Sequence, residues 1–215
     1  MAATVVFDLD KVLLGGDAST LFVRGRLRQA PGRLVLLLLA SPLLVVGSLI
    51  PQVRPLAARA MTRIAIGGRA DDDVEAVAAA YGEALGRTPE AAVADAIACL
   101  REHRRRGDVV VVATGCEETL ARGFLSAVGL GDLDVVGSTG RLWPPGVARA
   151  MGEAKVAMLA ERGYPPPWAA AYSDSATDLP LFAGTPRPVL VNPGENAVRQ
   201  VERTLGRRPE TRAWR

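Results

Sequence analysis

The stretch TVVFDLDKVL, residues 4–13, decides the fold of this chain. Its apolar and β-branched residues continue up to two carboxylates, Asp8 and Asp10, and such a run over residues 3–9 predicts a buried parallel strand. Side chains two residues apart lie on the same side of an extended chain, so both carboxylates can face one site. Charged groups at the end of a buried strand are costly unless something pairs with them. The alternative is turn chemistry, in which an aspartate accepts local backbone N–H groups.

The sequence after residue 107 alternates between strand and helix patterns. Strands are predicted at 108–115, 133–136, 168–172 and 188–191, and helices at 117–128, 153–162, 178–183 and 196–205. This alternation predicts an α/β fold, namely a doubly wound parallel sheet with helices on both faces. The last residues, GRRPETRAWR at 206–215, are predicted to form a loose tail.

Residues 18–106 have a helical pattern throughout, so an all-helical cap is predicted between the first strand and the rest of the sheet. Residues 1–17 and 107–215 are then predicted to form the α/β core, and residues 18–106 the cap. The last helix of the cap is predicted to begin with Thr88 as its N-cap and Pro89 in its first position, and to end at Gly107.

Composition and charge exclude several classes of protein. The chain has 215 residues, of which 49% are hydrophobic and 23% are charged, and a net charge of +3, which is ordinary for a globular protein. No basic block is interleaved with aromatic residues, so no nucleic-acid partner is expected. Two cysteines and one histidine do not make a zinc site, and His103 in REHRRRG (101–107) is predicted to lie at a solvated helix end. The N-terminus lacks the features of a signal peptide, so a cytoplasmic protein with reduced cysteines is expected.

Polar residues follow three further elements of the predicted core. Thr114 and Gly115 end the run VVVVATG (109–115), where a hydroxyl and free backbone N–H groups can hold an anion, unless Thr114 only caps a helix. Lys155 lies one turn into a predicted helix, and the alternative is a solvated surface lysine. Asp174 and Asp178 follow the fourth strand, although each alone is also typical of a helix start. Ligands of such sheets bind at the carboxyl ends of the strands, and paired carboxylates there are typical ligands of Mg²⁺.

Acids after the first strand, a hydroxyl after the second, then a lysine and paired acids form an ordered set of motifs. With this set the sequence resembles the haloacid dehalogenase (HAD) superfamily of hydrolases, and FDLDKVLLGGDAS (7–19) and YSDSATDLPLF (172–182) are the most similar stretches. The helical insertion directly after the first motif is similar to subfamily IB, which contains phosphoserine phosphatase. The resemblance covers essentially the whole chain and implies a HAD-like Rossmannoid core with a helical cap of the C1 type.

The resemblance implies a Mg²⁺-dependent phosphatase that works through an aspartyl-phosphate intermediate. Asp8 is the expected nucleophile, and Asp10 is the expected acid that protonates the leaving group and then activates water. Thr114, Gly115 and Lys155 are expected to hold the phosphoryl oxygens. The metal ligands are expected among four residues: Asp8, Asp10 through its carbonyl, Asp174 and Asp178.

Three further residues have roles or departures that follow from the resemblance. Asp17 stands at the base of the cap, where phosphoserine phosphatases have a carboxylate that meets the substrate amine, so it is expected to bind substrate. Asp178 is expected to orient Lys155 or a metal-bound water. Lys11 and Val12 stand where the family usually has Gly-Thr, and their side chains are expected to point away from the catalytic face.

The stretch LVLLLLASPLLVVGSLI (34–50) contains 17 residues without a charge. A membrane span needs roughly 20 apolar residues, and one crossing would separate Asp8 from Lys155 and Asp174, so a transmembrane span is excluded. Two interpretations remain open. The stretch is either a buried helix of the cap or a helical hairpin, broken at Ser41-Pro42, that dips into one leaflet of a membrane. In the second case nearby arginines would meet lipid phosphates, namely Arg24, Arg26, Arg28, Arg33, Arg54, Arg59 and Arg63.

The membrane-dipping alternative agrees with a resemblance to the C-type phosphatidylglycerophosphate phosphatases of the same subfamily. That resemblance is carried by the apolar, proline-containing segment and by GEAKVAML (152–159) with YSDS (172–175). The expected function is therefore hydrolysis of a lipid or amphiphilic phosphomonoester at the inner face of a membrane. The alternatives are a phosphatase for phosphoserine or another small metabolite, a phosphotransferase that uses the same residues, and a catalytically weak membrane-associated binding protein. The sequence leaves the oligomeric state open.

Overall fold

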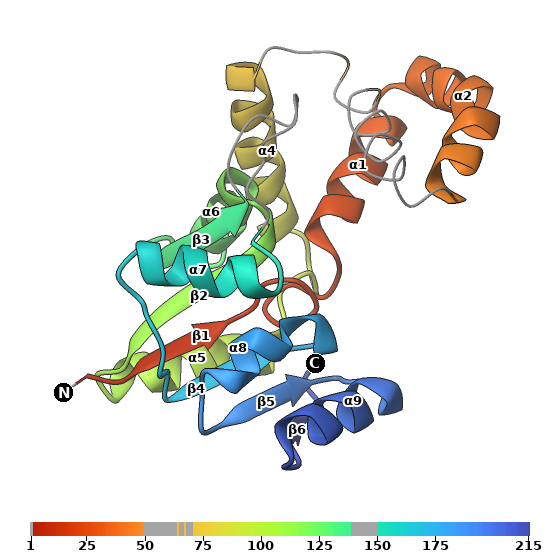
Figure 1. Cartoon of the computed structure of the whole chain (residues 1–215). Helices are drawn as coiled ribbons and strands as arrows, with labels where there is room; N and C mark the ends of the chain where they lie inside the picture. The colour runs from red at the N-terminus through yellow and green to blue at the C-terminus, as the bar shows by residue number, and fades with distance from the viewer. Residues whose placement is uncertain (1, 50–63, 65–66, 68–70, 139–149) are drawn as a thin grey trace.

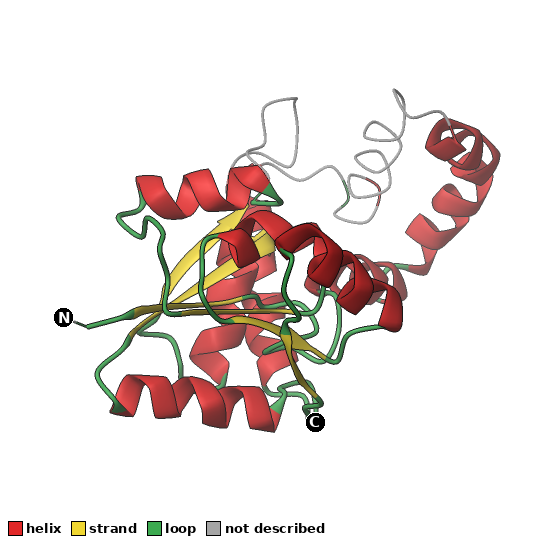
Figure 2. Cartoon of the chain, turned by 60° about the horizontal axis from the view of Figure 1, so that its bottom comes forward, coloured by secondary structure: helices red, strands yellow, loops and turns green. Residues whose placement is uncertain are grey.

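The computed structural model describes residues 2–49, 64, 67, 71–138 and 150–215 of the chain (Figure 1). Within them, a six-stranded parallel sheet has the order β3-β2-β1-β4-β5-β6. Figure 2 shows helices on both faces of this sheet, so the predicted α/β fold with a doubly wound parallel sheet is confirmed. The strands are β1 (Thr4–Phe7), β2 (Val109–Glu117), β3 (Asp134–Ser138), β4 (Ala170–Ser173), β5 (Pro188–Val191) and β6 (Glu210–Arg212).

The order of the strands places the end of β1 at the centre of the sheet. The chain starts in β1, moves outward through β2 to β3 on one side, and then crosses to β4 on the other side. Val6 of β1 pairs with Val111 of β2 and with Ala171 of β4, so the residues that follow these three strands lie at one edge. A sheet of this kind binds its ligands in the crevice where the strand order reverses.

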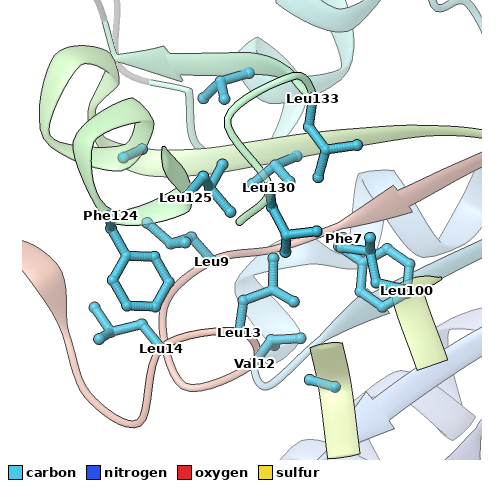
Figure 3. Close-up of a cluster of buried hydrophobic side chains, with 14 of the residues drawn as sticks. Phe7, Leu9, Val12, Leu13, Leu14, Leu100, Phe124, Leu125, Leu130 and Leu133 are labelled. Carbon is cyan, nitrogen blue, oxygen red and sulfur yellow. The ribbon is translucent and has the colours of Figure 1, made fainter. Parts of the chain in front are cut away.

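Side chains of β1 alternate between the two faces and anchor a core on each. Phe7 belongs to one apolar cluster, together with Leu100 and Phe124, and Figure 3 shows these side chains together with those of the loop after β1, such as Leu13 and Leu14. Val6 belongs to the other cluster, which includes Phe182. Successive side chains of a strand point to opposite faces of the sheet. Because both faces are buried here, every position of β1 needs an apolar or β-branched residue, which gives a continuous run. The described helices from residue 94 onward are α5 (Ala94–Arg105), α6 (Glu118–Ala127), α7 (Glu153–Glu161), α8 (Leu179–Ala183) and α9 (Glu195–Leu205).

Three described helices precede α5, namely α1 (Ala18–Arg28), α2 (Pro31–Leu49) and α4 (Asp71–Gly86). Helix α4 packs closely against α6 because glycines lie at the crossing. A Cβ atom added to Gly82 of α4 would stand 2.1 Å from the carbonyl oxygen of Leu120, and one added to Gly123 of α6 would stand 2.3 Å from that of Ala79. Both distances are far below any real contact, so the two backbones are closer than any larger residue allows.

The start of α5 differs from its predicted position. The helix begins at Ala94, with Val93 as its N-cap, rather than at Pro89. Glu90 has a φ of 63°, which is a left-handed conformation and cannot continue a right-handed helix. The end of the helix agrees with the prediction, since Gly107, with a φ of 84°, follows the C-cap residue Arg106. The predicted division of the chain at residues 17 and 107 stays a prediction, although Leu100 of α5 packs in the same cluster as Phe7 of the sheet.

The predicted loose tail is wrong, because residues 206–215 are held by the core. Residues 210–212 form β6, the edge strand beside β5. The side chain of Trp214 stacks on Tyr172 of β4, with ring centroids 5.6 Å apart. Two hydrogen bonds join the backbone of Trp214 to the side-chain amide of Asn192. The tail therefore forms the edge strand of the sheet and packs against β4 and β5.

Helix α2 contains the described part of the uncharged stretch and projects away from the sheet (Figure 1). The chain stays helical through Pro42, so the predicted break at Ser41-Pro42 is wrong; Ile50, Arg54, Arg59 and Arg63 lie outside the described residues. The interpretation as a buried cap helix is also wrong for six apolar side chains, since more than half of each is exposed. These side chains are Val35, Leu36, Leu38, Leu39, Val45 and Leu49. In the described part of the chain, no helix is long and apolar enough to cross a membrane.

Candidate active site

The end of β1 carries a buried cluster of three charged side chains. Asp8 directly follows β1, and its backbone N–H donates to the carbonyl of Tyr172 in the neighbouring β4. The ammonium group of Lys155 lies 3.1 Å from Oδ1 of Asp8 and 2.9 Å from Oδ2 of Asp178. The hydroxyl of Ser173 also donates to Asp178, at 2.7 Å. The alternative of a solvated surface lysine is therefore wrong, since Lys155 is only 3% exposed.

Local structure explains how Lys155 reaches this cluster. The chain turns at Gly152, whose φ is 56°, and α7 begins at the next residue. A left-handed backbone of this kind favours glycine, which has no Cβ atom. Lys155 lies in the first turn of α7, and its backbone N–H donates to the carbonyl of Gly152. Asp178 ends a short 3₁₀ turn, Ala176–Asp178, that follows β4, so both side chains approach Asp8 from elements that begin at the sheet edge.

The electrostatics of the cluster are those of charges removed from water. Burial raises the pKa of Asp8 to about 7, although the Lys155 ammonium opposes this shift. Burial alone would lower the pKa of Lys155, but the carboxylates of Asp8 and Asp178 raise it above its ordinary value. A buried lysine with two carboxylate partners stays protonated. The cluster thus holds one firm positive charge between two acids.

Asp10 and Asp17 lie beside the start of α1. Oδ1 of Asp10 accepts the backbone N–H of Ala18 at 2.7 Å, and burial raises the pKa of Asp10 to about 6 in spite of that hydrogen bond. Asp17 is the N-cap of α1 and accepts the backbone N–H of Thr20. Both carboxylates line the same cavity as Asp8. Asp10 therefore does both things that the sequence left open: it accepts a local backbone N–H, and it lines the candidate site.

Thr114 and Gly115 lie in the last part of β2 rather than at a helix start. The N-cap of α6 is Glu117, which accepts the backbone N–H of Leu120, so the interpretation of Thr114 as a helix cap is wrong. The pairing register of β2 shifts between residues 113 and 117, where the strand departs from regular geometry. Gly115 lines the cavity there. Thr114 is fully buried, and its hydroxyl oxygen accepts the N–H of Cys116, which leaves its O–H able to donate.

Asp174 follows β4 and meets a side chain that was expected elsewhere. Its carboxylate forms an ion pair with Lys11, whose Nζ lies 3.4 Å from Oδ2. Burial raises the pKa of Asp174, and the Lys11 ammonium opposes that shift. The expectation that the side chain of residue 11 points away from the catalytic face is therefore wrong.

These residues line a cavity of about 180 Å³, which we call the first cavity. Five carboxylates and two lysines line it, so its formal charge is −3; they are Asp8, Asp10, Asp17, Asp174, Asp178, Lys11 and Lys155. In the parts of the chain that the structure describes, no three His, Cys, Asp or Glu side chains are grouped closely enough to hold a metal ion. Lys155 stands between Asp8 and Asp178, and Lys11 stands beside Asp174. The excess of oxygen ligands and of negative charge nevertheless fits a hard divalent cation such as Mg²⁺.

Two side chains were not found, or were misplaced, by sequence reasoning. Ser173 holds Asp178 in place, and its only signal was its position between a buried strand and Asp174. His103 was predicted to be solvated but is 7% exposed, and it does not reach the first cavity. Its Nδ1 lies 2.7 Å from Asp108 and its Nε2 lies 2.9 Å from the hydroxyl of Tyr172. This histidine therefore connects α5 to β4 on the face of the sheet that is opposite to α7.

Comparison with known sequences identifies one family. Residues 5–183 match the sequence model of the family described as haloacid dehalogenase-like hydrolase. The match begins in β1 and ends in α8, so it includes each side chain of the buried cluster. No curated protein is significantly similar to the chain in sequence.

Comparison with solved structures finds the same fold. A protein of unknown function from Bordetella pertussis Tohama I has a TM-score of 0.59 and 20% identity, with 98% of this chain and 99% of that chain covered. A phosphoserine phosphohydrolase-like protein from Francisella tularensis subsp. tularensis SCHU S4 has a TM-score of 0.56 and 14% identity, with 99% and 95% covered. A phosphoserine phosphatase in its apo form has a TM-score of 0.54 and 12% identity, with 93% and 91% covered. At these identities the likeness is one of fold.

Proposed function

The chain belongs to the haloacid dehalogenase-like hydrolase family, and on this premise we propose that it is a phosphatase that hydrolyses phosphomonoesters through Asp8. The observation that carries the proposal is the contact of Lys155 with both Asp8 and Asp178 at the carboxyl edge of the sheet. A phosphoryl group is an anion and is repelled by a nucleophilic carboxylate. A protonated lysine beside that carboxylate offsets the repulsion, so that the phosphoryl group can approach.

The proposed reaction has two steps, and Asp8 and Asp10 divide the work. The Asp8 carboxylate attacks phosphorus, the bond from phosphorus to the leaving oxygen breaks, and Asp10 gives its proton to that oxygen. Asp10 then takes a proton from a water molecule that attacks the aspartyl-phosphate, which releases inorganic phosphate and restores Asp8. The pKa of about 6 supports this assignment to Asp10, because a group that alternately gives and takes a proton works best when its pKa is near the ambient pH.

Other residues of the first cavity would hold the phosphoryl group. Lys155 contributes its ammonium, and Gly115 and Thr114 contribute a backbone N–H and a hydroxyl. Asp178 acts through Lys155, which it orients together with Asp8. The assignment of Thr114 has the least support, because its side chain is fully buried and it is not among the residues that line the first cavity.

We further propose that Mg²⁺ binds to Asp8, to the carbonyl of Asp10 and to Asp174, and that Asp178 lies next to this ion. When bound, the ion neutralises part of the negative charge and draws charge from the phosphoryl oxygens. The formal charge of −3 in the first cavity supports this proposal.

The proposed substrate is a lipid or otherwise amphiphilic phosphomonoester, which the protein would reach as a peripheral protein at the inner face of a membrane. The exposed apolar side chains of α2 support this proposal, because such a patch on a soluble surface is typical of an interaction site. Arg24 and Arg28 of the adjacent α1 are exposed and carry the charge that attracts acidic lipid headgroups. This substrate agrees with a place in subfamily IB, with residues 18–106 as a C1-type cap, and with the C-type phosphatidylglycerophosphate phosphatases.

The alternative substrate is phosphoserine or another small amine-bearing metabolite. It rests on Asp17, whose carboxylate lines the first cavity, although one of its oxygens already accepts the N–H of Thr20. A catalytically weak membrane-associated protein is the non-enzymatic alternative, and the intact cluster of Asp8, Lys155 and Asp178 argues against it.

Hydrolysis of a generic aryl phosphate tests the proposal. We expect wild type to release phosphate only with Mg²⁺, and both Asp8→Asn and Asp10→Asn to lose at least about a hundredfold in kcat. Asp132→Asn is the matched control, because Asp132 is exposed and pairs with Arg104 at the surface. Equal rates for wild type and Asp8→Asn would contradict the proposed nucleophile.

A further inference from the structure

Lys11 has an unusual backbone for its residue type. Its φ is 56°, in the left-handed region, and its N–H donates to the carbonyl of Gly16 in the tight turn after Asp10. A residue with a Cβ atom is strained in this conformation, and glycine is not. Strain of this kind is kept where the side chain or the turn has a function.

The ion pair of Lys11 with Asp174 lies at the border of two cavities. Both residues line the first cavity, and both also line a second cavity of about 310 Å³. Glu90 and Asn192 lie in the wall of this second cavity. In the described part of the chain, Lys11, Glu90 and Asn192 are all the non-glycine residues with positive φ, and the second cavity brings the three together. Their gathering at one place points to a function for that place.

We propose that Lys11 sets the metal affinity of the site: its ammonium holds Asp174 in the metal-free protein, and it gives way to Mg²⁺ by turning into the second cavity toward Glu90. This inference rests on the proposed function, since it takes Asp174 as a metal ligand. Lys11 is a positioning residue in this account, because it acts through Asp174.

The contacts of Lys11 allow this movement. Its side chain is 60% exposed, and 3.4 Å is long for a charged hydrogen bond, so the pair with Asp174 is loose. A divalent cation on Asp174 would repel the ammonium at that distance and compete for the same oxygen. The second cavity gives the ammonium a place to go. Glu90 is exposed in its wall and makes no ion pair with another described residue, so it can receive the displaced charge.

Calorimetric titration of Mg²⁺ into the metal-free protein tests the proposal without an activity readout. Lys11→Met keeps the stem and the strained backbone but removes the charge, and we expect it to bind Mg²⁺ about tenfold more tightly than wild type. Lys11→Arg keeps the charge and should not tighten binding. Arg215→Gln is the matched control, because Arg215 also lines the second cavity but forms no ion pair with Asp174, and it should change affinity by less than about twofold.

A double-mutant cycle tests where the ammonium goes. Glu90→Gln should weaken Mg²⁺ binding about threefold when Lys11 is present and leave it unchanged in Lys11→Met. Equal Mg²⁺ affinities for wild type and Lys11→Met, or the same effect of Glu90→Gln in both backgrounds, would overturn the proposal and leave the phosphatase intact. Loss of Mg²⁺ binding in every variant, wild type included, would overturn the proposed metal site as well.

Discussion

The ammonium group of Lys155 and the carboxylate of Asp8 form a buried ion pair, with Nζ 3.1 Å from Oδ1 and both side chains less than a tenth exposed. The pair connects α7 to the end of β1 across 147 positions of sequence. Removing one partner of a buried ion pair costs much free energy of folding, because the other charge is then left unpaired and away from water. The same contact thus contributes to the stability of the fold and to the proposed catalytic site.

We expect Lys155→Met to destabilise the protein by about 3–5 kcal/mol, because Asp8 and Asp178 would then be buried without a cation. Urea unfolding measures the free energy of unfolding. The control is Arg199→Met, which breaks an exposed pair with Glu195 and should cost less than about 0.5 kcal/mol. The double variant Lys155→Met with Asp178→Asn should recover part of the loss, and no recovery would contradict this account of the cluster.

The crossing of α4 and α6 gives a prediction that is independent of the site. Gly82→Ala places a methyl group 2.1 Å from the carbonyl oxygen of Leu120, so one backbone has to move, and we expect a loss of about 2–4 kcal/mol. Gly32→Ala in α2 is the control, because a Cβ atom there meets nothing within 4 Å. It should be neutral or stabilise by up to about 1 kcal/mol. A loss for Gly82→Ala no larger than for Gly32→Ala, measured by urea unfolding, would show that the two helices are not in such close contact.

His103 gives a dependence of stability on pH. Hydrogen bonds to Cys99 and Asp108 raise its pKa above 6.5 although burial opposes them, so the folded protein favours the protonated imidazolium. Stability from this group is fully present below the unfolded pKa of 6.5 and is lost as pH rises through the higher folded pKa. The stability difference between wild type and His103→Gln should therefore be larger at about pH 5.5 than at about pH 8.5. A difference that is constant or grows with pH would contradict this assignment.

Helix α2 gives a prediction for membrane binding. Leu39 is 76% exposed, and burying one leucine in a bilayer contributes about 1.5–3 kcal/mol. We expect the protein to sediment with vesicles of phosphatidylglycerol and phosphatidylcholine, and Leu39→Glu to weaken that binding about tenfold or more. Thr204→Glu adds the same charge to an exposed position of α9 and serves as the control. Absence of vesicle binding by wild type would favour the small-metabolite alternative.

Sequence patterns could predict the centre of the sheet because β1, β4 and β5 are largely apolar runs. The predicted strand at 188–191 coincides with β5, and all four residues are buried. Strand β6 reads ETR, which has no apolar residue, and it exists only because its backbone pairs with β5 and Trp214 stacks on Tyr172. That stabilisation comes from residues distant in sequence, so no local pattern could indicate it.

The residues of the candidate site also divide into those that the sequence could predict and those that it could not. Asp8, Asp10, Asp174, Asp178 and Lys155 could be predicted from motif order, and the fold brings them to the lining of one cavity. Lys11 could not, because the direction of its side chain depends on a left-handed φ in a turn. His103 could not either, since its partner Tyr172 lies 69 positions away and removes it from water.

The measurement that tests the central claim most directly is the chemical trapping of the aspartyl-phosphate. Borohydride added during turnover reduces an acyl phosphate to a primary alcohol, and mass spectrometry of the peptides that contain residues 1–11 and residue 174 locates the change. We predict modification at Asp8 that requires substrate and is absent at Asp10 and Asp174. Turnover of substrate with no modification at Asp8, or with modification at another carboxylate, would contradict the account.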